Sequence, residues 1–214
     1  MTVIARRTLL SAAVLGAAAF ALVVPQFVSA AGVQVGQSAP AFSAKDTNGK
    51  TVSLADLKGK TVVLEWSNHE CPFVKKHYSS ANMQDLQKKW TAQNVVWLTI
   101  VSSPAGEQGY VDATQANKLT TDRGAAPSNV LLDPKSQIAR AYGAQVTPHM
   151  YIIAPDGKLA YAGGIDDKPS TRVDDIKTAT NYVDGALTNM AQGKPVETTT
   201  SRPYGCTVKY DTTS

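Results

Sequence analysis

The sequence predicts an α/β protein in which helices flank a mixed β-sheet, and three patterns support that fold class. Two apolar, β-branched runs, at residues 61–66 and 95–101, are typical of buried strands. The segment between them has the apolar spacing of an amphipathic helix. Later in the chain, a turn at residues 155–158 separates two short strand-like runs, which indicates a hairpin. A helical crossover followed by a hairpin requires parallel and antiparallel strands in one sheet.

The first 30 residues have the pattern of a secretory signal peptide. Arg6 and Arg7 precede an uncharged apolar run from Leu9 to Val24, and Val28-Ser29-Ala30 supplies small residues for cleavage. The alternative, an uncleaved anchor, is disfavoured because the run is shorter than the ~20 apolar residues that cross a bilayer. The paired arginines leave the general secretory and twin-arginine routes both open. We therefore expect a mature protein in the periplasm or outside the cell, without stable membrane insertion.

Composition and charge narrow the class of protein further. The chain has 43% apolar and 18% charged residues, which is the profile of a globular domain. The net charge of +4 includes Arg6 and Arg7, so the chain without its leader carries only +2. Nucleic acid is not expected as a partner, because phosphate binding needs a clustered basic surface. The two cysteines permit at most one intramolecular disulfide.

The first elements of the mature chain are a hairpin, a strand and a helix. An Asn48-Gly49 step between alternating runs, at residues 41–44 and 51–54, predicts a β-hairpin before the first core strand. After that strand, Pro72 is suited to the first position of a helix, because proline has no N–H to leave unpaired there. The polar stretch at residues 79–82 predicts a kink or a split in this helix.

The later elements alternate between strands and helices. They are a strand at 95–101, a helix at 109–121, a strand at 129–132, a short helix at 136–142, strands at 150–154 and 159–162, and a last helix at 174–190. Lys, Pro and Thr dominate residues 193–214. We therefore expect one domain at residues 31–192 and an extended C-terminal tail after it.

Cys71 is the first candidate for chemistry. It stands between the first core strand and the helix that begins at Pro72, so its sulfur should face free N–H groups and the positive end of the helix dipole. Lys75 and Lys76 would favour the thiolate further, whereas Glu70 would oppose it. Cys71 is thus predicted to be a reactive thiolate; the alternatives are an inert buried residue or one half of a structural disulfide.

The segments before and around Cys71 resemble those of a known family. Residues 35–42, 57–64 and 71–73 resemble the redoxins, a group of thioredoxin-like proteins that includes alkyl hydroperoxide reductase-type peroxiredoxins and exported thioredoxin relatives. The resemblance continues through Val146-Thr147-Pro148 and covers residues 33–165. It implies a thioredoxin fold with an N-terminal hairpin extension. It also implies that Pro148 is a cis-proline in a loop that faces the active cysteine and presents a backbone edge to the substrate.

The departures from the family pattern are also informative. Val74 stands where a thioredoxin has its second cysteine, which excludes ordinary Cys-x-x-Cys cycling. Leu64 and Asn68 replace the proline and threonine of peroxiredoxins, and Pro148 falls near the place of their arginine. Efficient peroxide reduction is therefore not expected. The combination looks most like the peroxiredoxin-like redoxins of bacterial envelopes.

Cys206 lies in the tail, well beyond the predicted domain. If the tail folds back, Cys206 could resolve a mixed disulfide or a sulfenic acid on Cys71. Alternatively, the two cysteines form a permanent staple, which chain entropy would make worth about 5 kcal/mol for so long a loop. Both interpretations stay open, because the sequence contains no information on the reduction potential.

Glu65 and three histidines are the other candidate polar groups. The resemblance implies that Glu65 is a buried acid that exchanges protons with Cys71; alternatively, it faces the open side of its strand. His69, His77 and His149 surround the same region in sequence, and Cys with His can hold copper or zinc. Their spacing is not that of a dedicated metal site, so no metal or other cofactor is predicted.

Together these features predict an exported, thiol-dependent oxidoreductase with antioxidant or thiol-disulfide exchange activity. Its predicted catalytic residues are Cys71, Cys206, Glu65 and Pro148, and its predicted substrate-binding residues are Pro72, Phe73, Thr147 and His149. The expected partners are an oxidised or thiol-containing protein or small molecule and an electron donor that the sequence does not identify. The alternatives are a peroxiredoxin-type peroxidase, a copper-binding protein and a disulfide-stapled envelope protein.

Overall fold

The computed structural model describes Met1 and residues 33–213, so the predicted signal peptide lies outside the described residues. At its centre is a sheet of five strands in the order β5-β4-β3-β7-β8. Their bounds are β3 (Val62–Trp66), β4 (Val96–Val101), β5 (Asn129–Leu132), β7 (His149–Ile153) and β8 (Leu159–Gly163). β3, β4 and β5 are parallel, whereas β7 and β8 run antiparallel to their neighbours. The predicted mixed α/β sheet is confirmed.

Two further pairs of strands and seven helices make up the rest of the secondary structure in residues 33–213. The small pairs are β1 (Ser43–Lys45) with β2 (Thr51–Ser53), and β6 (Val146–Thr147) with β9 (Cys206–Thr207). The helices are η1 (Leu54–Leu57), α1 (Pro72–Ser79), α2 (Asn82–Thr91), α3 (Ala113–Asp122), α4 (Gln137–Tyr142), η2 (Val173–Thr178) and α5 (Tyr182–Ala191). In the described part of the chain, no helix has the length and apolar character needed to cross a bilayer.

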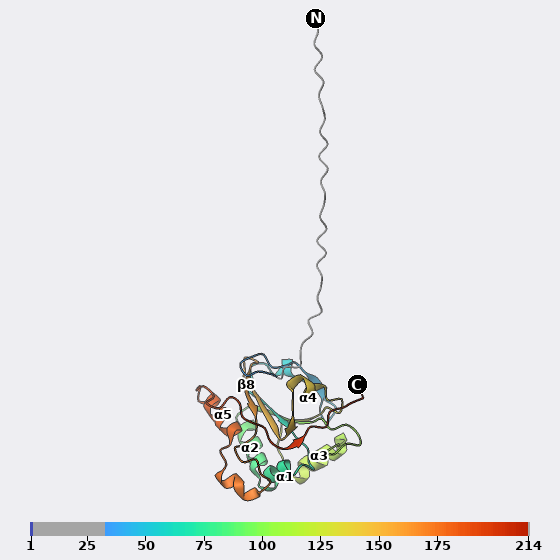
Figure 1. Cartoon of the computed structure of the whole chain (residues 1–214), viewed down its shortest axis with the longest axis vertical. Helices are drawn as coiled ribbons and strands as arrows, with labels where there is room; N and C mark the ends of the chain where they lie inside the picture. Colours follow the sequence, from blue (N-terminus) through green and yellow to red (C-terminus); the bar gives the residue numbers. More distant parts are fainter. Residues whose placement is uncertain (2–32, 214) are drawn as a thin grey trace.

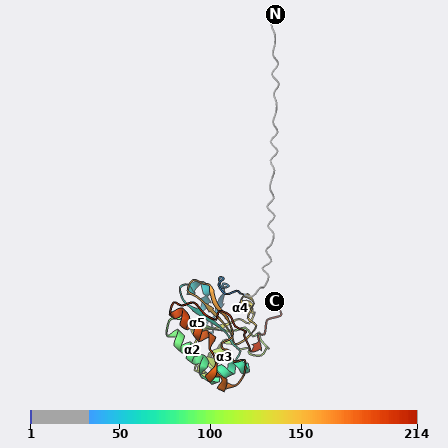
Figure 2. The same cartoon turned by 60° about the vertical axis from the view of Figure 1, so that its left-hand side comes forward.

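Elements pack on both faces of the central sheet. Strand β3 is therefore buried along its whole length. Leu64 and Trp66 point to the face covered by α4 and the N-terminal hairpin, where they share a core with Tyr142. Val63 points to the opposite face and packs with Trp90 of α2 and with residues of α5. Figures 1 and 2 show α4 separated from α2 and α5 by the sheet. The alternating side chains of one strand thus supply two cores.

Two predicted helices differ from the structure at their ends. The helix expected at residues 109–121 begins later, because Asp112 caps it and forms a reciprocal capping box with Gln115. The single helix expected at residues 174–190 is wrong, since η2 and α5 are separate. Asn181 is the reason: its side chain accepts a hydrogen bond from Asp184 N–H at 2.9 Å and starts α5 anew.

The predicted split after α1 is confirmed. Ala81 has a left-handed backbone, with φ of 63°, between α1 and α2. The Ser80 hydroxyl accepts a hydrogen bond from Asn82 N–H at 3.4 Å. In a continuous helix this N–H would instead donate to a backbone carbonyl oxygen one turn earlier. Cys71 therefore begins a short helix of eight residues.

The C-terminal tail is extended, as predicted, and lies against the domain. Near Thr200 it runs parallel to Ala162 of β8, and it then crosses to pair with β6. Beyond that pair, Val208 is buried in the α4-side core, and the Tyr210 hydroxyl donates to the carbonyl oxygens of α4 and its C-terminal loop. In Figure 1 this red segment crosses the molecule to the short arrow of β9.

Candidate active site

Cys71 lies at the N-terminus of α1, at the end of the loop that follows β3. Pro72 begins the helix, and the Cys71 carbonyl oxygen accepts a hydrogen bond from Lys75 N–H at 2.9 Å. The Val74 N–H of the first helical turn lowers the pKa of the Cys71 thiol. The side chain has 0% exposure, and its Sγ lies 3.1 Å from the carbonyl oxygen of Thr147. The predicted strand, Cys-Pro, helix arrangement is confirmed.

Cys206 reaches the same place from the C-terminal tail. β9 pairs antiparallel with β6, and this register places Cys206 opposite Thr147. The two cysteines are free thiols, and each alters the pKa of the other. Cys206 keeps part of its surface exposed, whereas Cys71 is covered. The tail therefore brings the two cysteines of the chain together.

The loop opposite Cys71 contains the expected cis peptide bond, between Thr147 and Pro148. The backbone edge of this loop is occupied by the chain's own tail, because β9 pairs with β6 there. Gly205 permits the close approach: a Cβ atom at this position would lie 1.9 Å from the Thr147 carbonyl oxygen. The edge that the resemblance assigns to the substrate is thus covered by residues 205–207.

The other predicted substrate-binding residues lie in different surroundings. Pro72 is exposed, and the Phe73 ring packs edge-on against Tyr204 of the tail, with 5.8 Å between ring centroids. His149 is buried beside Tyr151, whose hydroxyl lies 3.2 Å from the His149 Nδ1. Burial lowers the pKa of His149 to about 4, so the ring is neutral near pH 7. Substrate contacts by these residues stay predictions.

The two thiols have opposite tendencies to ionise. Burial opposes ionisation of Cys71, but hydrogen bonds led by those from the Cys206 thiol and Val74 N–H hold the pKa of Cys71 below its ordinary value. Burial and the adjacent Cys71 raise the pKa of Cys206 to about 12. Lys76, which we expected to favour the Cys71 thiolate, pairs instead with Asp166. The helix N-terminus and the tail therefore favour a thiolate at Cys71.

We expect the Cys71 thiolate to form below the pKa of about 8.5 of a free cysteine. Thiolate ultraviolet absorbance measured across pH would report it without requiring access to the buried sulfur. Cys206→Ala should move the midpoint upward, because it removes a hydrogen-bond donor. Ionised Cys71 stabilises the fold above the unfolded thiol pKa, and this stabilisation is lost as pH falls through the lower folded pKa. A wild-type midpoint at or above 8.5 would contradict an activated nucleophile.

Glu65 is a buried acid, the first of its two sequence-based interpretations. It has 0% exposure in β3. Its carboxylate accepts hydrogen bonds from the Tyr78 hydroxyl at 2.8 Å, Trp97 Nε1 at 2.9 Å, Thr99 Oγ1 at 3.1 Å and Gln87 Nε2 at 3.1 Å. Burial raises the pKa of Glu65, and the four donors oppose that rise without cancelling it. None of these partners is a cysteine, so proton exchange with Cys71 stays a prediction.

The three histidines do not gather around a common point. His77 Nδ1 lies 2.9 Å from Asn82 Nδ2, and its Nε2 lies 3.2 Å from the Tyr204 hydroxyl, so both ring nitrogens have protein partners. Burial lowers the pKa of His77 to about 3 and also lowers the pKa of His69. Within residues 33–213, no group of three or more His, Cys, Asp or Glu side chains could hold a metal ion.

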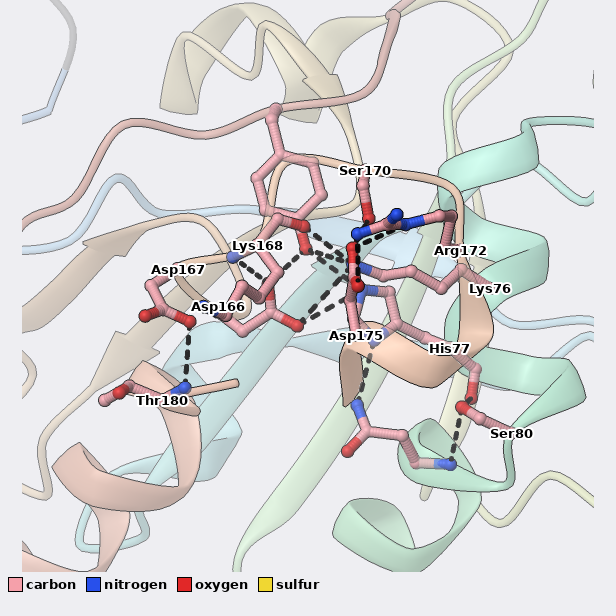
Figure 3. A network of polar contacts seen from close by, with 12 residues as sticks. Lys76, His77, Ser80, Asp166, Asp167, Lys168, Ser170, Arg172, Asp175 and Thr180 are labelled. Carbon is pink, nitrogen blue, oxygen red and sulfur yellow. Dashed lines mark hydrogen bonds and ion pairs between the residues drawn. The ribbon is translucent and has the colours of Figure 1, made fainter. Parts of the chain in front are cut away.

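The structure also contains a buried ion pair on α1, the helix that Cys71 begins, and the sequence did not predict it. Lys76 Nζ lies 3.7 Å from Asp166 Oδ2, and both side chains are almost fully buried. Figure 3 shows Lys76 and His77 of α1 extending toward Asp166. Lys76 also donates to the Tyr204 hydroxyl at 3.1 Å. Tyr204 stands close to Cys206 in sequence, but no local pattern links it to Asp166, which lies 38 residues earlier.

A cysteine at the start of the helix after a central strand, facing a cis-proline loop, defines this protein as a thioredoxin-fold redoxin. The chain belongs to the AhpC/TSA family, which it matches over residues 35–162. The family resemblance drawn from the sequence is thereby confirmed.

Individual relatives agree with this assignment. The thiol-disulfide oxidoreductase ResA of Bacillus subtilis (strain 168) is 28% identical over 133 residues, which are 62% of this chain and 69% of that protein. An uncharacterized conserved protein from Geobacillus kaustophilus has a similar crystal structure, with a TM-score of 0.70, 25% identity and coverage of 85% of this chain and 94% of that chain. A hypothetical protein from Sinorhizobium meliloti 1021 shares the fold, with a TM-score of 0.73, 24% identity and coverage of 84% and 96%.

Proposed function

We propose that this protein is an exported thiol-disulfide oxidoreductase in which Cys71 is the nucleophile and Cys206 the resolving cysteine. The juxtaposition of the two cysteines carries the proposal: Cys71 Sγ lies 3.1 Å from the Thr147 carbonyl oxygen, and Cys206 pairs with Thr147 across the β6–β9 ladder. Val74 occupies the position in α1 where a thioredoxin has its second cysteine. The C-terminal tail provides the second cysteine instead, because β9 places Cys206 opposite Thr147. The Bacillus subtilis relative, ResA, is a thiol-disulfide oxidoreductase, which supports the same chemistry. The predicted signal peptide, residues 1–30, supports export to a compartment where disulfides persist.

The first step is attack by the Cys71 thiolate on a substrate disulfide. A bond forms between the Cys71 sulfur and one substrate sulfur, and the second substrate sulfur leaves as a thiolate. The negative charge thereby leaves Cys71, so the Cys206 pKa is then raised by burial alone and no longer by an adjacent thiolate. The Cys206 proton passes to the departing thiolate. Cys206 thus becomes a thiolate, and therefore a nucleophile, once the mixed disulfide has formed.

The second step is attack by Cys206 on the Cys71 sulfur. It forms the Cys71–Cys206 disulfide and releases the remaining substrate sulfur as a thiolate, which takes a proton from solvent. The substrate has gained two electrons and the protein has lost two. An external thiol donor, itself oxidised to a disulfide, returns the protein to its reduced form. The proposed partners are thus a disulfide-containing protein or small molecule and a thiol reductant.

The test is a redox titration of the mature protein in glutathione buffers, with free thiols counted by mass-tagged alkylation. We expect one two-electron transition with a midpoint above about −300 mV. Cys206→Ser should instead accumulate a glutathione mixed disulfide on Cys71, because the resolving thiol is absent. Cys71→Ser is the matched control, and it should accumulate far less adduct because Cys206 lies in strand β9 and lacks the helix N-terminus that favours a thiolate at Cys71.

Two other outcomes would replace the proposal. A Cys71–Cys206 bond that stays oxidised below about −300 mV would identify a structural staple. A Cys71 that reacts with hydrogen peroxide much faster than with a disulfide would identify a peroxidase, the activity that Leu64 and Asn68 disfavour. Sulfenic acid trapping on Cys71 in the Cys206→Ser variant separates this second outcome from disulfide exchange.

A further inference from the structure

Tyr204 inserts its hydroxyl into a buried polar socket, which we define as Lys76, His77 and Asp166. The three socket side chains come from two elements, α1 and the loop after β8, and Figure 3 shows them converging. Lys76, His77 and Asp166 are each at most 2% exposed. The socket side chains are therefore shielded from water, and besides Tyr204 they are held by the Lys168 backbone, which accepts from Lys76 Nζ at 2.8 Å and donates to Asp166 Oδ1 at 2.9 Å.

The Tyr204 hydroxyl uses every hydrogen-bonding site that it has. A phenol oxygen donates one hydrogen bond and accepts two. Here the hydroxyl donates to Asp166 Oδ1 and accepts from Lys76 Nζ at 3.1 Å. Its third partner is His77 Nε2 at 3.2 Å. The three contacts fix both the position and the direction of the hydroxyl.

The direction of the His77 contact follows from the ring's other nitrogen. His77 Nδ1 lies 2.9 Å from the amide nitrogen of Asn82, which donates to it. Burial lowers the pKa of His77 to about 3, so the ring is neutral and carries its one proton on Nε2. Nε2 therefore donates to the Tyr204 oxygen. A neutral histidine and a charged lysine thus donate to the same oxygen, while Asp166 accepts from it.

The socket ties the tail to the helix that carries the nucleophile. Cys71, Phe73 and Lys76 all belong to the first two turns of α1 or its N-cap. The Phe73 ring packs against the Tyr204 ring, and Lys76 Nζ lies 5.0 Å from the centroid of that ring. One side chain of the tail therefore contacts α1 through its ring and its hydroxyl, two residues before Cys206.

We propose that Tyr204 is a positioning residue for thiol-disulfide exchange: its hydroxyl, held by the socket, sets the distance between the Cys206 and Cys71 sulfurs. The inference rests on the proposed function, because it assigns a role in forming the Cys71–Cys206 bond. Tyr204 is not itself a reacting group. It acts by keeping the tail in register with α1, so that Cys206 meets Cys71 at a high effective concentration.

The test compares Tyr204→Phe with wild type in two measurements. Phenylalanine keeps the ring packing on Phe73 and removes only the hydroxyl. The equilibrium constant for the Cys71–Cys206 bond against glutathione should fall about tenfold or more, because three buried polar groups lose their shared partner. The thiolate midpoint of Cys71 should rise, since the Cys206 donor is no longer held beside it.

Tyr210→Phe is the matched control. Tyr210 is also a tail tyrosine with a hydrogen-bonded hydroxyl, which donates to Ala139 and Ala144 carbonyl oxygens, but it lies beyond Cys206 and outside the socket. It should change the equilibrium constant by less than about threefold, because the loss of one ordinary hydrogen bond beyond Cys206 does not move the Cys206 sulfur. An equal loss in both variants would mean general loosening of the tail and would overturn the proposal.

A double-mutant cycle separates positioning from a structural effect. In a Cys206→Ala background, Tyr204→Phe should leave the Cys71 midpoint unchanged, because no thiol remains to be positioned. His77→Gln, a second variant with Tyr204 intact, should produce a smaller loss in the same direction. If wild type forms no reversible disulfide, the proposed function fails. If it forms one that Tyr204→Phe leaves unaltered, only the positioning role fails.

Discussion

Replacing Gly205 with alanine should lower the equilibrium constant for the Cys71–Cys206 disulfide by about a hundredfold, since a strained backbone residue costs about 1–3 kcal/mol and the paired position of the tail would have to bear that strain. The added Cβ would lie 1.9 Å from the carbonyl oxygen of Thr147 and 2.6 Å from its carbonyl carbon. Both atoms belong to the backbone of a buried loop, so the tail must move instead. The φ of +146° at Gly205 adds strain for alanine. Glutathione titration with mass-tagged thiols measures the change.

Gly193→Ala is the matched control for this prediction. Gly193 belongs to the same tail and also has a positive φ, of 67°, but a Cβ atom there meets nothing within 4 Å. Alanine at this position should lower the stability of the fold by about 1 kcal/mol, because its backbone has a positive φ, but it should not move Cys206. Comparable disulfide equilibria in Gly205→Ala and wild type would show that the close pairing of β9 with β6 is not needed for bond formation.

Replacing Glu65 with leucine should lower the free energy of unfolding by about 4 kcal/mol or more, since each buried donor left without an acceptor costs about 1–3 kcal/mol. Leucine occupies nearly the volume of the glutamate but accepts no hydrogen bond. It would leave three donors without an acceptor, from Trp97, Tyr78 and Thr99, while Gln87 Nε2 would keep the Tyr78 hydroxyl at 3.3 Å. Urea denaturation of the two proteins at pH 7 measures the difference.

Glu65→Gln is the control, and it also isolates the charge. Glutamine keeps a carbonyl acceptor, so its loss of stability should be smaller. Because burial raises the folded-state pKa of Glu65 above 4.5, the folded protein binds the proton more tightly than the unfolded chain does. Wild-type stability should therefore decline as pH rises from about 4.5 through the folded pKa, and Glu65→Gln should lack this decline. Equal slopes would contradict the raised pKa.

The same two variants test a catalytic role for Glu65. If the carboxylate moves a proton for Cys71, Glu65→Gln should slow disulfide exchange and alter its pH profile while the fold persists. If Glu65 is structural, exchange rates should follow stability alone. The four hydrogen-bond partners of the carboxylate make both measurements necessary, because stability and proton transfer depend on the same group.

Local patterns in the sequence determined the elements around Cys71. The strand of residues 61–66, Pro72 at the first helical position and the split at residues 79–82 all follow from side-chain periodicity, proline geometry and backbone competition. The resemblance to redoxins added the cis bond before Pro148, which composition and spacing do not indicate. These features depend on residues that are neighbours in the chain.

Only the tertiary structure decided where the C-terminal tail lies and which groups it meets. Cys206 pairs with the Thr147 strand, and Tyr204 enters the socket of Lys76 and Asp166, across long separations in sequence. Such contacts have no period or spacing, because they arise from packing between elements whose order in space no local pattern specifies. The sequence itself determined that Cys71 begins a helix; the folded tail determined which thiol stands beside it.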